Sequence, residues 1–118
     1  MFIAGKSLNP IDFSRLRIFD YTAGRDFSSS VTVIDAPSCV HHPEAWSKRS
    51  DKYYLVISGT ILFVLDGVET ELSAGDFCVV PRGSRFSYSN PSATIARLVL
   101  VHTPRFDLDS EVSVDSKR

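Results

Sequence analysis

Side chains that could act as acids or bases recur in several parts of this chain. His42 lies in the only cluster of histidine and glutamate, and Lys52 and Tyr54 follow in a segment of strand-forming residues. Tyr88 and His102 lie further along the chain. One acid/base pair drawn from Lys52, Tyr54, Tyr88 and a histidine such as His42 is enough for isomerase, epimerase, cyclase or lyase chemistry. The sequence leaves open whether the protein is an enzyme.

The same histidine cluster also offers ligands for a metal ion. His41, His42 and Glu44 could bind a divalent ion, with His102 or Asp51 as a further ligand. Adjacent histidines on an extended chain point to opposite faces, so the two rarely serve one ion. A solvated loop is therefore the favoured interpretation of this cluster, and a relocated metal site is the alternative.

Short strand-forming segments separated by turns predict an all-β fold. The clearest strands are expected at 31–35, 52–57, 60–65 and 68–72, with Asp66-Gly67 as a hairpin turn. Further strands are expected at 16–21, 78–80, 85–89 and 94–102. About eight or nine short strands without a helical period are typical of a jelly roll or barrel.

Three pieces of the chain look less regular. Residues 1–15 carry no strand signal, and residues 39–51 are expected to be a loop that feeds a short strand, since Pro43 interrupts a helix. The polar residues 107–118 predict a frayed tail, or an arm that packs on a neighbour. We therefore divide the chain into an N-terminal arm with the first strand (1–30), a single-domain barrel (31–106) and a polar C-terminal tail (107–118).

Gly75, Pro81, Gly83 and Asn90 follow one another with the spacing G-x5-P-x-G-x6-N, and Gly59 ends the preceding strand segment. In this spacing they resemble the second motif of the cupin family, and Gly59 resembles the last glycine of its first motif. The resemblance covers roughly residues 30–106 and implies a single-domain cupin jelly-roll β-barrel. It also implies a homodimer, which is common among small cupins.

The resemblance fails at the positions where cupins hold their metal. The glutamate position is Lys52, the histidine position of the second motif is Phe86, and the paired histidine positions are Trp46 and Lys48, or Ala45 and Ser47 with a longer spacer. An ammonium group is not a ligand while it is charged. We therefore expect a barrel without the usual metal and without another cofactor.

The cupin resemblance implies that these replaced positions face the barrel interior. Lys52 and Tyr54 then share one strand face, and Trp46 and Lys48 another. Two lysines in an apolar pocket repel each other unless an anion lies between them, because an unpaired buried charge is costly. The resemblance thus predicts a small anionic or sugar-like ligand. Its contacts would be hydrogen bonds from Tyr54 and Tyr88 and stacking on Trp46, with Phe86 in the wall.

Arg85 and His102 are two further candidates for ligand binding. Arg85 flanks the Pro81–Gly83 corner and could hold an anionic substituent at the rim, although a surface position is favoured. His102 lies on the last strand, where parity decides whether it faces inward. A core or interface histidine is the favoured interpretation.

Composition limits the partners that the protein can have. The chain has 118 residues, a net charge of −1 and 43% hydrophobic residues, so neither nucleic acid nor an anionic membrane is expected as a partner. No run of about 20 apolar residues exists, and we expect a cytoplasmic protein. The alternatives to a metal-free binding or catalytic barrel are a metal-dependent cupin with relocated ligands, and a non-catalytic domain with a filled barrel.

Overall fold

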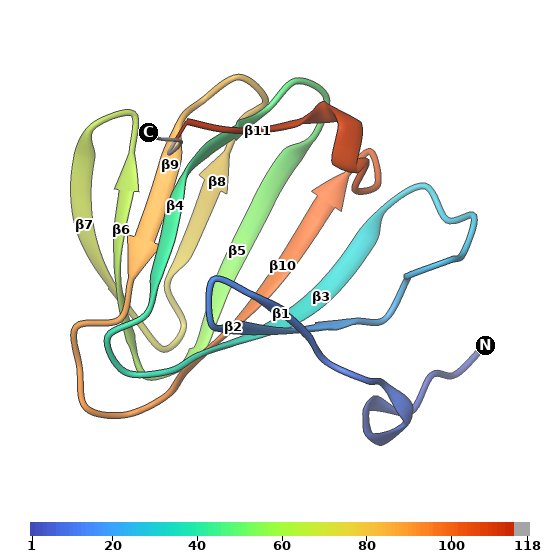
Figure 1. Cartoon of the computed structure of the whole chain (residues 1–118), viewed down its shortest axis with the longest axis horizontal. Helices are drawn as coiled ribbons and strands as arrows, with labels where there is room; N and C mark the ends of the chain where they lie inside the picture. Colours follow the sequence, from blue (N-terminus) through green and yellow to red (C-terminus); the bar gives the residue numbers. More distant parts are fainter. Residues whose placement is uncertain (115–118) are drawn as a thin grey trace.

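The chain folds into two antiparallel sheets that face each other across one hydrophobic core (Figure 1). The computed structural model describes residues 1–114. The larger sheet has the strand order β1-β2-β3-β10-β5-β8, and the smaller sheet has the order β11-β4-β9-β6-β7. This arrangement confirms the predicted all-β, jelly-roll architecture.

The predicted central strands agree with the structure to within about one or two residues at most ends. The larger sheet contains β1 (Ile11–Phe13), β2 (Leu16–Asp20), β3 (Ser30–Ala36), β10 (Ala96–Thr103), β5 (Asp51–Ser58) and β8 (Phe77–Val80). The smaller sheet contains β11 (Glu111–Ser113), β4 (His41–Ser47), β9 (Phe86–Ser89), β6 (Thr60–Leu65) and β7 (Val68–Ser73). Two short 3₁₀ helices, η1 (Gly5–Ser7) and η2 (Leu108–Ser110), flank the sheets. Within residues 1–114, no helix has the length and apolar character needed to cross a membrane.

Aromatic side chains pack against one another between the two sheets. Tyr54 of β5 meets Phe63 of β6 edge-on, with ring centroids 5.2 Å apart. Phe63 also stacks on Phe86 and Tyr88 of β9, at 6.0 and 5.6 Å. Such pairs contribute about 0.5–1.5 kcal/mol each beyond the burial of their area. They fix the positions of the two tyrosines that the sequence nominated for catalysis.

The segment 39–51 is more regular than the sequence predicted. His41–Ser47 forms β4, which pairs with β9, and Pro43 lies inside this strand. The register shifts between His42 and Ala45, so Pro43 lies in an irregularity where the ladder is interrupted. The expectation of a loop was therefore wrong, because the interruption accommodates a proline that a regular ladder would not.

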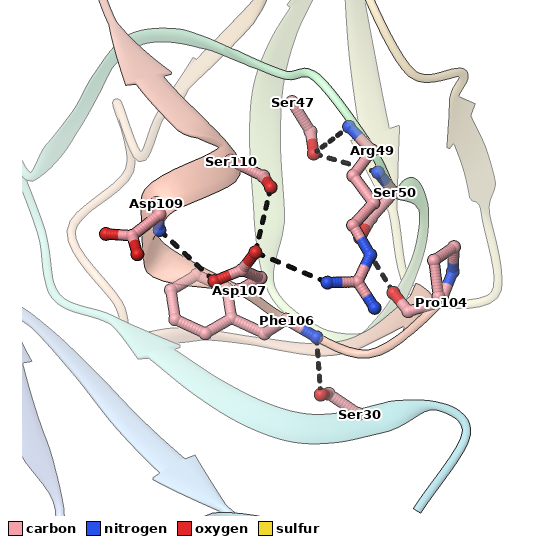
Figure 2. Close-up of polar contacts among 9 residues, drawn as sticks. All are labelled: Ser30, Ser47, Arg49, Ser50, Pro104, Phe106, Asp107, Asp109 and Ser110. Atoms are coloured by element: carbon pink, nitrogen blue, oxygen red, sulfur yellow. Dashed lines mark hydrogen bonds and ion pairs between the residues drawn. The ribbon is translucent and has the colours of Figure 1, made fainter.

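The C-terminal segment is folded up to the last described residues. Asp107 caps η2: its carboxylate accepts hydrogen bonds from the Asp109 backbone N–H, the Ser110 hydroxyl and the Arg49 guanidinium, at 3.3, 3.0 and 3.3 Å (Figure 2). β11 then pairs with β4 at one end of the barrel (Figure 1). The predicted frayed tail was therefore wrong for residues 107–113. Residues 115–118, which the same prediction covered, lie outside the described part of the chain.

The outer face of the larger sheet exposes a patch of apolar side chains on β5 and β8. Leu55, Ile57, Phe77 and Val79 are 37%, 46%, 56% and 39% exposed, and Tyr53 stacks on Phe77 at 6.1 Å. A contiguous apolar patch of this kind marks an interaction surface more often than scattered single residues do. The homodimer stays a prediction, and this outer face is where we expect it to form.

Replacing Phe77 by arginine at the centre of this face should shift the protein from dimer to monomer. A buried, unpaired charge would oppose association, whereas the fold should tolerate the change because Phe77 lies outside the core. Light scattering after size exclusion would measure the mass. Val68→Arg, at an exposed hairpin position, is the matched control. A wild-type monomer would contradict the expectation.

Gly59 shows why the motif that it belongs to requires glycine. It joins β5 to β6 with φ of +78°, and a Cβ there would lie 2.8 Å from the Ala96 Cα atom of β10. That contact is with backbone, so the neighbour cannot simply rotate away. Both the conformation and the close approach therefore exclude a side chain.

Gly59→Ala should destabilise the protein by more than about 2 kcal/mol, since strain at positive φ adds to a backbone clash. Gly67→Ala is the control: its φ is +82°, but nothing lies within 4 Å of the added Cβ. Gly67→Ala should lower the free energy of unfolding by only about 1 kcal/mol, the cost of holding an alanine at positive φ. Urea denaturation measures both values, and equal losses would show that the close approach to Ala96 does not matter.

Candidate functional site in the barrel

The barrel holds a cavity of about 420 Å³ between the two sheets. Its wall is largely apolar, and its polar side chains include Asp12, Asp20, His42, Lys52, Tyr54, Tyr88, His102 and Glu111. The hairpin of β1 and β2 and the C-terminal segment also border it. A mostly apolar hollow with a few converging polar groups is the usual form of a small-molecule site. The alternative of a solidly packed barrel was therefore wrong.

His42 lies in this wall with one ring nitrogen engaged. Its Nδ1 is 2.6 Å from the Pro43 carbonyl oxygen. A carbonyl only accepts, so Nδ1 carries the proton and Nε2 is left as the ring's acceptor. The ring packs against Phe13, Phe86 and Tyr88, with centroids 5.4, 5.0 and 5.0 Å away. Burial lowers the pKa of His42 to about 4, so the imidazole is neutral at pH 7 and can act as a base.

Tyr54 and Tyr88 place two phenol groups close to one another in the core. Both side chains are 1% exposed, and their rings meet edge-on at 5.7 Å. The Tyr88 hydroxyl is buried without a hydrogen-bond partner among residues 1–114. Burial raises the pKa of both phenols above the ordinary value, so they are neutral donors at physiological pH. An unpartnered buried donor on a residue that lines a cavity is suited to a ligand.

Lys52 is held by a carboxylate and an imidazole. Its Nζ donates a very short hydrogen bond to Glu111 Oε1 and lies 3.3 Å from His102 Nε2. The ammonium also lies 5.1 Å from the centre of the Phe86 ring, in the range of a cation–π contact. Burial lowers the pKa of Lys52, and the Glu111 charge opposes that shift. Burial and the Lys52 charge lower the pKa of His102 to about 3.

Six of the residues nominated from the sequence are brought together here. They are His42, Lys52, Tyr54, Phe86, Tyr88 and His102, and each lines the cavity. Their catalytic or binding roles stay predictions. The alternation of side chains along β10 places His102 on the inner face, where it is 4% exposed.

Trp46 and Lys48 do not lie where the sequence suggested. Ala45 and Ser47 are the buried residues of β4, whereas Trp46 is half-buried outside the cavity and Lys48 is exposed. The longer of the two motif spacers therefore applies, and a shift of one residue reverses the faces of a strand.

Arg85 was a candidate for the rim of the pocket, with a surface position favoured, and it is exposed outside the cavity wall. Its guanidinium lies 3.5 Å from the Glu44 carboxylate on the surface. Since Lys48 also lies outside, the residues within 1–114 that line the cavity include no pair of lysines that would need an anion between them. The premise of the anionic ligand is therefore wrong, and Glu111 already supplies the opposite charge to Lys52.

Glu111 and Phe13 were missed by the sequence analysis. Glu111 lies in the segment that was expected to fray, and Phe13 in one expected to be irregular. The one signal for Glu111 was indirect: a lysine at an inward position needs an opposite charge, and the few acids after the barrel were candidates to supply it.

The inward residues do not fit the divalent metal that the cupin fold usually carries. Ala45, Ser47, Lys52 and Phe86 occupy the ligand positions of the motifs, and the Lys52 ammonium would repel a cation. Within residues 1–114, no three histidine, cysteine, aspartate or glutamate side chains are grouped so that they could hold a metal. The alternative set of His41, His42, Glu44 and His102 is accordingly not assembled, since His41 and Glu44 are exposed.

Comparison with known proteins agrees with this architecture. The family model described as "Cupin domain" matches residues 31–102. The chain belongs to the cupin family. A curated relative, acetate kinase EutQ of Clostridioides difficile, is 32% identical over 59 residues, which are 50% of this chain and 36% of EutQ. This cupin therefore spans little more than a third of that relative.

Solved structures of cupins superpose over nearly the whole chain. Pac13, described as a unique nucleoside dehydratase, is 22% identical with a TM-score of 0.84, covering 97% of this chain and 90% of its own. KdgF from Halomonas sp. is 17% identical with a TM-score of 0.78, covering 91% and 96%. Streptomyces Pac13 variants with a histidine replaced by glutamine, or one of two tyrosines by phenylalanine, are each solved with uridine. At these identities, the likeness establishes the fold of this cupin.

The neutral, enclosed His42 should make the protein sensitive to acid. The unfolded chain takes up a proton at His42 near pH 6.5, whereas the folded chain takes it up near pH 4. Between these values the unfolded state binds more protons, so the free energy of unfolding falls as the pH falls. The full shift corresponds to about 3 kcal/mol. Urea denaturation at pH 7.5 and pH 5 would measure the part that is lost above pH 5, about 2 kcal/mol, because pH 5 is still above the folded pKa.

His42→Gln should reduce this loss, while His41→Gln, at the exposed neighbouring position, should change it much less, because the charge of His41 is the smallest cause of the lowered pKa of His42. His102 contributes in the same direction, because its pKa is also lowered, to about 3. Part of the acid sensitivity should therefore persist in His42→Gln. An acid sensitivity equal to that of the wild type in His42→Gln would contradict the assignment.

Proposed function

We propose that this cupin binds a neutral, hydroxyl-bearing metabolite such as a nucleoside in its barrel and removes water from it by acid/base catalysis. The observation that carries the proposal is the convergence of a neutral histidine, whose Nδ1 is engaged and whose Nε2 is left as the acceptor, with two neutral tyrosine hydroxyls in one largely apolar cavity. Acid/base elimination needs a base and an acid, and these residues supply both.

The likeness to Pac13 supports the same chemistry. Pac13 is described as a nucleoside dehydratase, and its variants at one histidine and two tyrosines are solved with uridine. The substituted histidine has the same residue number as His42, and the two tyrosine numbers are one higher than those of Tyr54 and Tyr88. With superposition over 97% of this chain, these are the residues expected to correspond.

Each residue has a definite task in this elimination. His42 Nε2 takes a proton from a substrate carbon next to the carbon that carries the departing hydroxyl. The electron pair of the broken C–H bond forms the new C=C bond as the C–O bond breaks. The hydroxyl leaves as water with a proton from the phenol of Tyr88 or Tyr54, and the proton on His42 then returns to that phenolate. The ammonium of Lys52 stabilises the negative charge that develops during the step.

Replacement of the three residues should separate binding from turnover. His42→Gln, Tyr54→Phe and Tyr88→Phe should each lower kcat by about 10²–10⁴-fold, since each removes an acid or a base. Mass spectrometry would detect the loss of one water from a panel of nucleosides, sugars and their carbonyl-bearing oxidation products. The carbonyl forms are included because imidazole removes a proton most readily from a carbon next to a carbonyl.

His41→Gln and Tyr53→Phe are the matched controls, because they make the same chemical changes outside the cavity wall. Both should retain wild-type turnover. Ligand binding without water loss in any panel compound would instead indicate a binding protein. Turnover that persists in His42→Gln would refute the assignment of the base.

A further inference from the structure

Glu111 brings a carboxylate to the cavity from beyond the region that the cupin family model covers. It lies on β11, opposite Ser47 of β4, and its side chain is 14% exposed. Its Oε1 accepts a hydrogen bond from Lys52. Its Oε2 is buried and has no hydrogen-bond partner among the described residues. A buried acceptor of this kind calls for a partner, which a bound molecule can provide.

Two unpartnered donors belong to residues that line the same cavity. His102 Nε2 faces the Lys52 ammonium, which only donates, so Nε2 accepts and Nδ1 carries the ring proton. That Nδ1–H group is buried without a partner within residues 1–114, as is the Tyr88 hydroxyl. A ligand that offers both donors and acceptors is therefore required. Hydroxyl groups meet this requirement, because each one donates and accepts.

We infer that Glu111 makes the cavity selective for neutral, hydroxyl-bearing ligands and against their phosphorylated forms. A ligand hydroxyl donates to Glu111 Oε2, and a hydroxyl oxygen accepts from His102 Nδ1. The inference rests on the proposed function because it concerns the ligand of the same cavity. It narrows that ligand to an unphosphorylated nucleoside or sugar.

The charges of the cavity oppose a phosphate group. In the described part of the chain, Lys52 is the one lysine or arginine that lines the cavity, and Glu111 already pairs with it. A phosphate near Glu111 Oε2 would meet a like charge in an environment where repulsion is stronger than in water. It could reach Lys52 only by displacing the carboxylate, which would leave that charge buried and unpaired.

Binding of uridine and of uridine 5′-monophosphate tests this selectivity by calorimetry. Wild-type protein should bind uridine at least roughly 10-fold more tightly than the monophosphate, since one hydrogen bond to a charged group corresponds to roughly 10- to 100-fold. Glu111→Gln keeps the size of the side chain and frees the Lys52 charge. It should weaken uridine binding by roughly 10-fold and strengthen monophosphate binding by a similar factor, reversing the preference.

Asp109→Asn is the matched control, because it removes one negative charge from the same segment at an exposed position outside the cavity wall. It should leave both affinities unchanged. His42→Gln should lose turnover and keep the preference for uridine, which separates this inference from the proposed reaction. If Glu111→Gln does not fold, the wild-type preference alone decides. Equal wild-type affinities, no binding of either compound, or an unchanged preference in a folded Glu111→Gln protein would overturn the inference.

Discussion

The buried ion pair between Lys52 and Glu111 is the interaction on which the rest of the site depends. The two side chains are 6% and 14% exposed, and each charge taken from water alone would cost several kcal/mol. Pairing offsets that cost, and loss of one partner of such a pair typically destabilises a protein by about 3–5 kcal/mol. The pair therefore joins β5 of the larger sheet to β11 of the smaller one. Burial, and to a smaller extent the charge of Lys52, lowers the pKa of both His42 and His102.

The motif residues that match the cupin pattern support the backbone, whereas those that differ face the cavity. Asn90 is fully buried, and its side-chain amide donates to the Ala36 and Thr94 carbonyl oxygens at 2.8 and 2.7 Å. Gly59 makes room for β10. Lys52 and Phe86 instead replace metal ligands on the inner wall. The scaffold is thus conserved in its geometry while the chemistry inside it changes, as expected when function resides in a site carried by a common fold.

The fold was largely predictable from the sequence because its signals are local. Hairpin glycines and alternating apolar residues define β5, β6 and β7 without any knowledge of distant contacts. The wall formed by Lys52, Tyr54 and Tyr88 followed from alternation once the cupin register was assumed. The predicted inward position of Lys48 was wrong because the interruption at Pro43 decides which residues of β4 face inward. No local sequence pattern reveals such an irregularity. The position of Glu111 in the site was missed because it depends on a contact with Lys52, which is 59 residues away in the sequence.

The position of β11 bears on how this protein can be divided. The family match ends at residue 102, and the strand that closes the barrel wall beside β4 comes after it. An expression fragment trimmed at the family boundary would retain both tyrosines, the histidine proposed as the base and every motif glycine. That fragment would nevertheless lack Glu111, so the Lys52 ammonium would have no opposite charge beside it. A fragment defined by the limits of the family match would therefore lack part of the cavity wall.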